Sequence, residues 1–293
     1  MSTQRDRKEN LAALPLVAPF VLVYAALFVY PSLEMLVTSF TDGALTKSGD
    51  WVGLENYAKL FRDRYFGAAL RNTLYFVALT VVPGAMFGLL LALVVNNLKG
   101  YWQAIALSVF FVPFILPVST VTAIANLLTD TANGPLGGLV TSPNGTVIPV
   151  WRSATWFMPA VAVLTIWWTV GLNVLLFLAG LRTIPRDIYE AAGLDGAGRW
   201  AAFRYLTWPL LRPITILVLT IQLISQIRVF DQIYLMASQG PGRSATVLVQ
   251  YIYSVAFQRN QAGYASAVAV ALFALGVGVV VLQFQLLRLR RTR

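Results

Sequence analysis

The sequence predicts an all-α membrane protein with six transmembrane helices, and three observations support this prediction. Hydrophobic residues make up 58% and charged residues 12% of the 293 positions, which excludes an ordinary soluble domain. Six apolar stretches are long enough to cross the hydrocarbon as helices of about 20 residues. Basic residues also gather beside alternate ends of these stretches, as they do in multi-pass proteins. A helical crossing is needed because unpaired backbone groups find no water inside a bilayer.

The predicted spans account for nearly all of the apolar sequence. In chain order they are residues 12–38, 73–96, 104–128, 157–181, 213–236 and 263–287. Four of them contain no charged residue, the first contains only Glu34, and the fifth contains Arg228 and Asp231. The first span is too long for the apolar core of a signal peptide and lacks a small-residue cleavage site. We therefore expect it to be retained as a membrane helix.

Arg228 and Asp231 stand three residues apart, so a continuous helix would bring their side chains together. We interpret them as a structural ion pair near the outer end of the fifth span, because charges inside a bilayer are costly unless they are paired. A proton or ion relay is the alternative interpretation. A relay needs further titratable groups, and the sequence has no His and no second acid in the apolar centres.

The distribution of Lys and Arg predicts that both termini are cytoplasmic. An even number of spans places both termini on one side of the membrane. With the termini inside, the inner segments carry thirteen of the 22 Lys and Arg residues, and the longer outer segments carry eight. Basic residues are retained on the cytoplasmic side. We therefore expect a cytoplasmic N-terminus over residues 1–11 and a cytoplasmic basic tail over residues 288–293.

Composition also excludes several chemistries. With no Cys and no His, the chain offers no thiolate nucleophile, His-based metal site or imidazole base. None of its lysines lies in a Gly-x4-Gly-Lys-Ser/Thr phosphate-binding loop, so we do not expect the chain to hydrolyse ATP. The net charge of +10 follows the membrane topology and lacks interleaved aromatic residues on a soluble face, which argues against a nucleic-acid partner. We expect no enzymatic activity, metal or cofactor in this chain.

The segment between the fourth and fifth spans, residues 182–212, is polar and rich in Arg. Thr183 can cap a short helix that starts near Pro185 and ends near Gly193, and a second helix leads from Arg199 to Pro209. Two helices this short are marginal in water, so they need a surface on which to lie. The small residues Ala191 and Ala192 allow close approach of a partner protein beside the charge of Glu190. The alternative is an amphipathic loop that lies on the inner leaflet.

The spacing within this segment resembles a known family. Its motif comprises Ile184-Pro185, Tyr189, Glu190-Ala191-Ala192, Leu194-Asp195-Gly196-Ala197-Gly198 and Pro209, and it resembles the coupling loop of permease subunits in ATP-binding-cassette importers of the maltose and glycerol-phosphate type. Both ends of the chain are also similar to the first of the two permeases in such systems. The similar positions are Pro31, Ser39-Phe40-Thr41-Asp42, Gly53-Leu54-Glu55-Asn56-Tyr57, Asn72-Thr73, Phe230-Asp231, Gly240-Pro241, Tyr251-Ile252-Tyr253, Phe257 and Gly263-Tyr264-Ala265-Ser266-Ala267.

This resemblance implies a bacterial inner-membrane permease with a five-helix core preceded by an extra N-terminal helix. The implied division is a first helix and outer loop over residues 12–68 and a permease core over 69–287. The implied partners are a second permease, a dimer of ATPase subunits that binds ATP and Mg, an extracytoplasmic solute-binding protein and membrane lipid. The implied residues for coupling to the ATPase are Tyr189, Glu190, Ala191, Ala192, Asp195, Gly196, Ala197 and Pro209.

Polar side chains within two spans are candidates for the solute path. In the fourth span Thr165, Trp168, Thr169 and Leu172 share one helical face, and in the fifth span Gln222 and Gln226 share a face with Ser225 beside them. Amides can donate to and accept from sugar hydroxyls, and an aromatic ring suits the apolar face of a pyranose. The resemblance implies that these positions line the solute site. The alternative is that the polar groups bond between helices and that Trp168 lies at the membrane interface.

The function implied is translocation of a carbohydrate or related polyol by alternating access, driven by separate ATPase subunits. Saccharide, polyol and glycerol-phosphate all remain open, as does a non-sugar solute. An ion-coupled secondary transporter would carry its own energy coupling in buried acids or discontinuous helices and would show internal repeats. The sequence shows neither a clear repeat nor a proton or ion relay. In a channel or membrane scaffold, the inner loop would be only an anchor.

Overall fold

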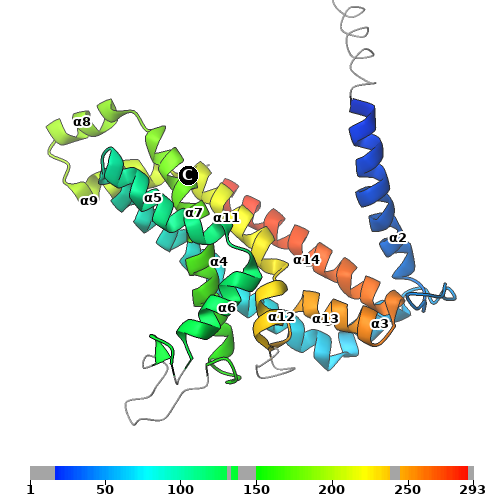
Figure 1. Cartoon of the computed structure of the whole chain (residues 1–293). Coiled ribbons are helices and arrows are strands. Elements are labelled where there is room, and N and C mark those ends of the chain that lie inside the picture. Colours follow the sequence, from blue (N-terminus) through cyan, green and yellow to red (C-terminus); the bar gives the residue numbers. More distant parts are fainter. Residues whose placement is uncertain (1–16, 131–132, 138–149, 238–244, 290–293) are drawn as a thin grey trace, which may run out of the picture. The chain divides into compact units, whose positions relative to one another are not determined.

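The computed structural model describes residues 17–130, 133–137, 150–237 and 245–289, and this part of the chain confirms the predicted all-α fold (Figure 1). The longer helices are α4 (Arg64–Asn97), α5 (Tyr101–Ile115), α6 (Val118–Leu128), α7 (Phe157–Arg182), α11 (Arg212–Ile227) and α14 (Ala262–Leu289), and a helix over Val17–Thr38 ends in the π-helical turn η1 (Ala25–Val29) and α2 (Tyr30–Thr38). The shorter ones are α3 (Glu55–Arg62), α8 (Arg186–Leu194), α9 (Arg199–Ala202), η3 (Phe203–Thr207), α10 (Trp208–Leu210), α12 (Asp231–Ala237), α13 (Leu248–Tyr253) and η5 (Ser254–Gln258).

Both chain ends are only partly described. The expected cytoplasmic N-terminus over residues 1–11 and residues 290–293 of the expected basic tail lie outside the described residues. The same holds for residues 12–16 of the first predicted span and for Gly240-Pro241, two of the positions that resemble the permease family. These predictions therefore stay predictions.

Among the described residues, four helices are long and apolar enough to cross a membrane unaided: Val17–Thr38, Arg64–Asn97, Phe157–Arg182 and Ala262–Gln285. Two bent pairs complete the six spans if each pair counts as one. The first pair is α5 with α6, which are bent by 104° at the break between them, so the predicted span 104–128 is divided between two helices. Leu116 stands before Pro117 in an extended conformation, with φ −69° and ψ 138°, because proline disfavours helical geometry in the residue before it.

The fifth predicted span, 213–236, is also not one helix. Before the span, the helical segment 199–210 and α11 are bent by 63° relative to each other. Within the span, α11 ends at Ile227, because Arg228 leaves helical geometry with φ −100° and ψ 18°. The chain becomes helical again only at Asp231, the first residue of α12. Arg228 donates from Nε to the carbonyl of Ile224 at 3.2 Å. The continuous helix that predicted an ion pair between Arg228 and Asp231 is therefore absent, and the pair itself stays untested.

The chain divides into two compact units. The larger comprises residues 64–251 and 274–293, and its core lies between α4, α7 and α11. Glycines permit the close approach of these helices, since a side chain at Gly88 would overlap that of Asn173 and a Cβ at Gly180 would lie 2.7 Å from Ile214. At one end of the unit, α8 and α9 project from the bundle (Figure 1). The helices that carry the candidate residues are thus packed directly against α4.

The smaller unit comprises residues 1–63 and 252–273, and it gives the segment after α2 a defined structure. The buried Asn56 donates from Nδ2 to the carbonyls of Ser39 at 3.0 Å and Thr41 at 2.7 Å. Gly263, at the start of α14, donates from its backbone N–H to the Gly43 carbonyl at 2.9 Å, and a side chain there would overlap the carbonyl of Thr41. The predicted outer loop is therefore bound to the start of the last helix.

Candidate functional site

The loop over residues 182–212 forms two short helical pieces, as expected, but its first boundary differs from the prediction. Thr183 does not cap α8, because its hydroxyl donates to the Gly180 carbonyl at 2.8 Å and closes the end of α7. Pro185 precedes α8 in an extended conformation. Asp187 lies in the first turn of α8, where a carboxylate favours the helix dipole.

A glycine ends α8 sharply. Gly196 has φ +79°, a left-handed conformation that side-chain-bearing residues rarely adopt. The backbone N–H of Gly196 donates to the Gly193 carbonyl at 3.1 Å, and the backbone N–H of Ala197 donates to the Ala192 carbonyl at 2.9 Å. These two bonds form a Schellman motif, which satisfies carbonyls at the end of the helix. The motif explains why Gly196 stands at this position and turns the chain toward α9.

The second piece leads into α11 through irregular helix. Arg199–Ala202 is α-helical, and in the π-helical turn η3 the N–H of Trp208 reaches back five residues to the Phe203 carbonyl. Pro209 has no N–H to give to Tyr205, so the regular ladder cannot continue there. Tyr189 on α8 contacts the buried Thr207 on η3, with 2.9 Å between their hydroxyl oxygens. Sequence reasoning missed Thr207, because only the folded loop brings it to Tyr189.

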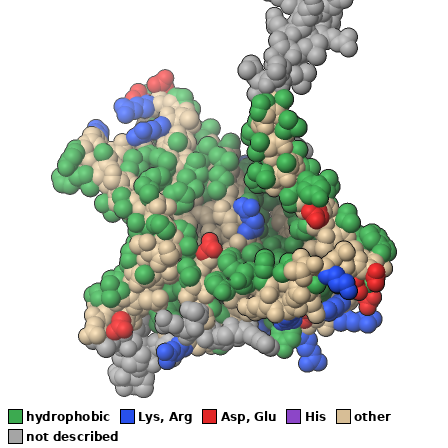
Figure 2. All heavy atoms as spheres, turned by 45° about the vertical axis from the view of Figure 1, so that its right-hand side comes forward, with side chains coloured by type: hydrophobic (Ala, Val, Ile, Leu, Met, Phe, Trp, Pro, Cys, Tyr) green, Lys and Arg blue, Asp and Glu red, His purple; other side chains and the backbone are tan. Residues whose placement is uncertain are grey.

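The predicted coupling residues are largely accessible. Glu190, Ala191, Asp195 and Gly196 are exposed, Ala192, Ala197 and Pro209 are half-buried, and charged side chains gather on the projecting α8–α9 segment (Figure 2). The side chain of Leu194, at the end of α8, is 91% exposed, which the sequence did not single out. An exposed apolar residue beside small residues and a carboxylate is a combination found at protein interfaces.

The predicted solute-path residues of α11 are mostly buried in this chain. Gln222 and Gln226 are 5% and 4% exposed, and Gln226 Nε2 donates to Gln222 Oε1 at 3.1 Å. A Cβ at Gly84 of α4 would lie 3.7 Å from Gln222 Nε2. Gln222 therefore forms part of the packing between α11 and α4, Gln226 is bonded to it, and only Ser225 of this set is exposed.

On α7 the predicted path residues differ in accessibility. Thr165 is buried and its hydroxyl donates to the Val161 carbonyl at 2.7 Å, whereas Thr169 and Leu172 are half-buried. Trp168 donates from Nε1 to the Leu116 carbonyl at 3.2 Å, at the bend between α5 and α6. The indole N–H thus bonds to a carbonyl at the break between α5 and α6, where the regular helical hydrogen bonds are interrupted. Solute contact by any of these residues stays a prediction.

A buried residue that the sequence did not single out joins these helices. Asn173 of α7 donates from Nδ2 to the Gly84 carbonyl at 3.1 Å, beside Pro83, which interrupts the hydrogen-bond ladder of α4. The sequence offered only two separate signals, an amide within one apolar span and glycines within another. That signal does not say which helices meet.

The family comparison identifies the type of protein. The family described as "binding-protein-dependent transport system inner membrane component" matches residues 84–293, which is most of the chain. This chain belongs to that family. It is therefore a multi-pass membrane permease of a binding-protein-dependent transport system.

Curated relatives match the permease over nearly its whole length. It is 34% identical to the sulfoquinovosyl glycerol transport system permease protein SmoG of Agrobacterium fabrum, over 97% of this chain and 92% of that protein. It is 32% identical to the arabinooligosaccharides transport system permease protein AraP of Bacillus subtilis, over 93% of this chain and 86% of that one. A crystal structure of a bacterial ABC transporter that imports the acidic polysaccharide alginate contains a chain with a TM-score of 0.85 and 21% identity, covering 98% and 99% of the two chains. That likeness supports the fold.

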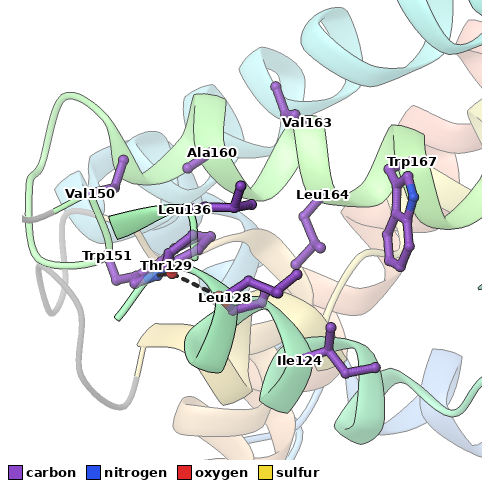
Figure 3. A pocket seen from close by; sticks show the side chains of 11 residues that line it. Ile124, Leu128, Thr129, Leu136, Val150, Trp151, Ala160, Val163, Leu164 and Trp167 are labelled. Atoms are coloured by element: carbon purple, nitrogen blue, oxygen red, sulfur yellow. Dashed lines mark hydrogen bonds between the residues drawn. The ribbon is translucent and has the colours of Figure 1, made fainter. Parts of the chain in front are cut away.

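The permease also has an apolar pocket of about 470 Å3 between α6 and α7 (Figure 3). Leu128, Leu164 and Trp167 are among the residues whose side chains line it. Three side chains in Figure 3 carry polar atoms, and two of these, Trp151 Nε1 and Thr129 Oγ1, already bond to each other at 2.7 Å, which leaves the indole N–H of Trp167. Since a sugar needs several free donors and acceptors, this pocket is unsuited to a carbohydrate.

The described residues of the permease contain no group of three or more acidic side chains that could hold a metal ion. The expectation that ATP and Mg bind to a partner rather than to this chain stays a prediction.

Proposed function

We propose that this permease forms half of the translocation path of a bacterial carbohydrate importer and is driven by separate ATPase subunits that bind loop 182–212. The observation that carries the proposal is the exposed end of α8, where Glu190, Ala191 and Leu194 stand free of the bundle. A second permease would complete the path, and an extracytoplasmic binding protein would deliver the solute. The structural neighbour described as an alginate transporter in complex with its pentasaccharide-bound periplasmic protein supports the binding-protein partner.

The carbohydrate class is supported by relatives whose names refer to sugars or sugar derivatives. Besides the two permeases above, the chain is 32% identical over 92% of its length to the multiple sugar-binding transport system permease protein MsmF of Streptococcus mutans. A saccharide, a glycosylated glycerol and a polyol all present hydroxyl groups that half-exposed Thr and Trp side chains can contact. Ligand screening of the associated binding protein would identify the solute, and binding of non-sugar solutes alone would contradict the carbohydrate class.

The proposed mechanism follows from how the loop is attached. The loop is continuous with α7 at Arg182 and with α11 at Arg212, so a displacement of α8 is applied directly to both helices. The Tyr189–Thr207 contact joins the two halves of the loop, and Asn173 ties α7 to α4. Closure of the ATPase dimer would move these helices as a group and switch the path between inward-open and outward-open states.

The first test changes the exposed end of α8 and measures transport. In the complete complex, Glu190→Gln removes a charge that we expect to pair with a basic residue of the ATPase, at a cost of about 1.5–3 kcal/mol. Gly196→Ala forces a Cβ into a left-handed conformation, at a cost of about 1–2 kcal/mol. Both variants should lower ATP-dependent uptake and ATPase co-purification about tenfold.

The matched control is Gly198→Ala. Gly198 lies in the same turn with φ −69°, and a Cβ there meets no atom within 4 Å. Uptake and assembly should stay near wild type in this control. Wild-type uptake and assembly in both Glu190→Gln and Gly196→Ala would overturn the proposed coupling role.

A further inference from the structure

A second cavity, of about 540 Å3, lies where α4 and α7 end beside the α9 segment. The end of α4 forms one wall and residues 199–207 form another, with Leu181 and Tyr189 also in the lining. All of these residues belong to the larger unit of the chain. The lining shares Tyr189 with the predicted coupling residues, but it includes neither Glu190 nor Leu194 and none of the candidate solute-path residues.

Along α4 the residues that line the cavity change from apolar to polar. Leu90 and Leu93 come first, and Asn96 and Asn97 follow at the end of the helix. At a rise of 1.5 Å per residue, the step from Leu90 to Asn97 covers about 10 Å. One end of the cavity is therefore apolar and lies inside the span, while the other is polar and lies at the helix terminus. An amphiphile has the same distribution of apolar and polar groups.

The charge of the cavity has one sign. Arg199 is the charged residue among those that line it, and no Asp or Glu takes part in the described lining. A guanidinium binds phosphate through paired hydrogen bonds. The amide of Asn96 can donate further ones, and Asn97 Nδ2, which donates to the Leu93 carbonyl at 2.9 Å, has a second N–H to give. Beside Arg199, the 74%-exposed indole of Trp200 packs at 5.6 Å, centroid to centroid, against Phe203. Exposed Trp rings of this kind are typical of the level of lipid headgroups.

We propose that this cavity binds an anionic phospholipid of the surrounding membrane. The phosphate contacts Arg199 and the amides at the end of α4, and one acyl chain lies along Leu90 and Leu93. Basic pockets between transmembrane helices on the cytoplasmic side are known to suit such headgroups. Arg199 begins the piece of the loop that also contains Thr207, and Thr207 contacts Tyr189 of α8. A lipid bound at Arg199 therefore helps to hold α8 in position.

The test measures lipid binding to the purified full-length chain by native mass spectrometry, with phosphatidylglycerol and phosphatidylethanolamine as probes. We expect phosphatidylglycerol to bind more tightly than phosphatidylethanolamine. Arg199→Gln should weaken phosphatidylglycerol binding about tenfold. The matched control is Arg204→Gln, which removes an exposed Arg of the same loop that does not line the cavity and should leave binding unchanged. This readout requires neither solute nor ATPase, so it is independent of the proposed transport function.

A second variant fills the cavity without changing its charge. Ala202→Trp places a large ring in the lining and should reduce binding of phosphatidylglycerol, while a thermal melt checks that the variant is folded. Equal binding of the two lipids, or equal loss in Arg199→Gln and Arg204→Gln, would overturn the proposal. Full competition by millimolar inorganic phosphate would instead indicate a free-anion site. Loss of ATPase binding in Ala202→Trp with lipid binding unchanged would indicate a protein partner in the cavity.

Discussion

Asn173 joins α7 to α4 at a point where α4 carries two glycines. Its amide donates to the Gly84 carbonyl, and its Cβ occupies the space that a side chain at Gly88 would need. A buried amide in an apolar span is costly unless it is bonded, and here the bond goes to the helix next to it. The glycines and the asparagine therefore act as one contact, and the identity of each residue depends on the other two.

This contact predicts a selective effect of adding one methyl group. Gly88→Ala should lower the free energy of unfolding in detergent by about 1–3 kcal/mol, because the new Cβ overlaps Asn173. The matched control is Gly67→Ala on the same helix, where a Cβ meets no atom within 4 Å. It should be neutral or stabilising by up to about 1 kcal/mol. Equal unfolding midpoints for the two variants would show that α4 and α7 do not approach closely here.

At the scale of elements, the loop depends on a contact between two pieces that are each too short to be stable alone. The nine-residue α8 ends in a Schellman motif, and the four-residue α9 continues into a π-helical turn. The Tyr189 and Thr207 hydroxyls connect them at 2.9 Å. Isolated helices of this length are marginal, so the contact helps to fix the direction of α8.

Removing that hydrogen bond should loosen the loop without unfolding the bundle. Tyr189→Phe should weaken binding of the ATPase subunits roughly 2- to 10-fold, since the bond contributes about 0.5–1.5 kcal/mol. Thr207→Val should have a similar effect, and the double variant should be no worse than either single one. Tyr205→Phe, at a 74%-exposed position of the same segment, is the control and should bind normally. Additive losses in the double variant would show that the two hydroxyls act separately.

At the scale of the whole molecule, the expected orientation places loop 182–212 in the cytoplasm and the segment after α2 outside. The chain has no Cys, so a single introduced Cys reports its own side of the membrane. Ser48 and Gly198 are both exposed and lie in the two segments. In intact cells, a membrane-impermeant maleimide should label Ser48→Cys at once and Gly198→Cys only after permeabilisation. The reverse pattern would overturn the predicted orientation of the spans and termini.

The sequence by itself predicted the features that depend on composition and local chemistry. The all-α membrane fold and the six apolar stretches follow from the cost of unpaired backbone groups in a bilayer. The division of the loop into two short helices, with a break between Gly193 and Arg199, follows from the glycines there and their conformational freedom. The resemblance to a coupling loop was also visible in the sequence, because its residues lie within one short segment, and the coupling role of these residues stays a prediction.

Only the tertiary structure decided which residues meet across the chain. The 104° bend between α5 and α6 and the end of α11 at Ile227 depend on backbone geometry that apolar composition does not report. Gln222 and Gln226 share a helical face as predicted, yet the packing turns that face toward α4. The partners of Asn173 and Thr207 lie 89 and 18 residues away, so helical periodicity could not reveal them. Periodicity says which side chains share a face, and packing determines what that face contacts.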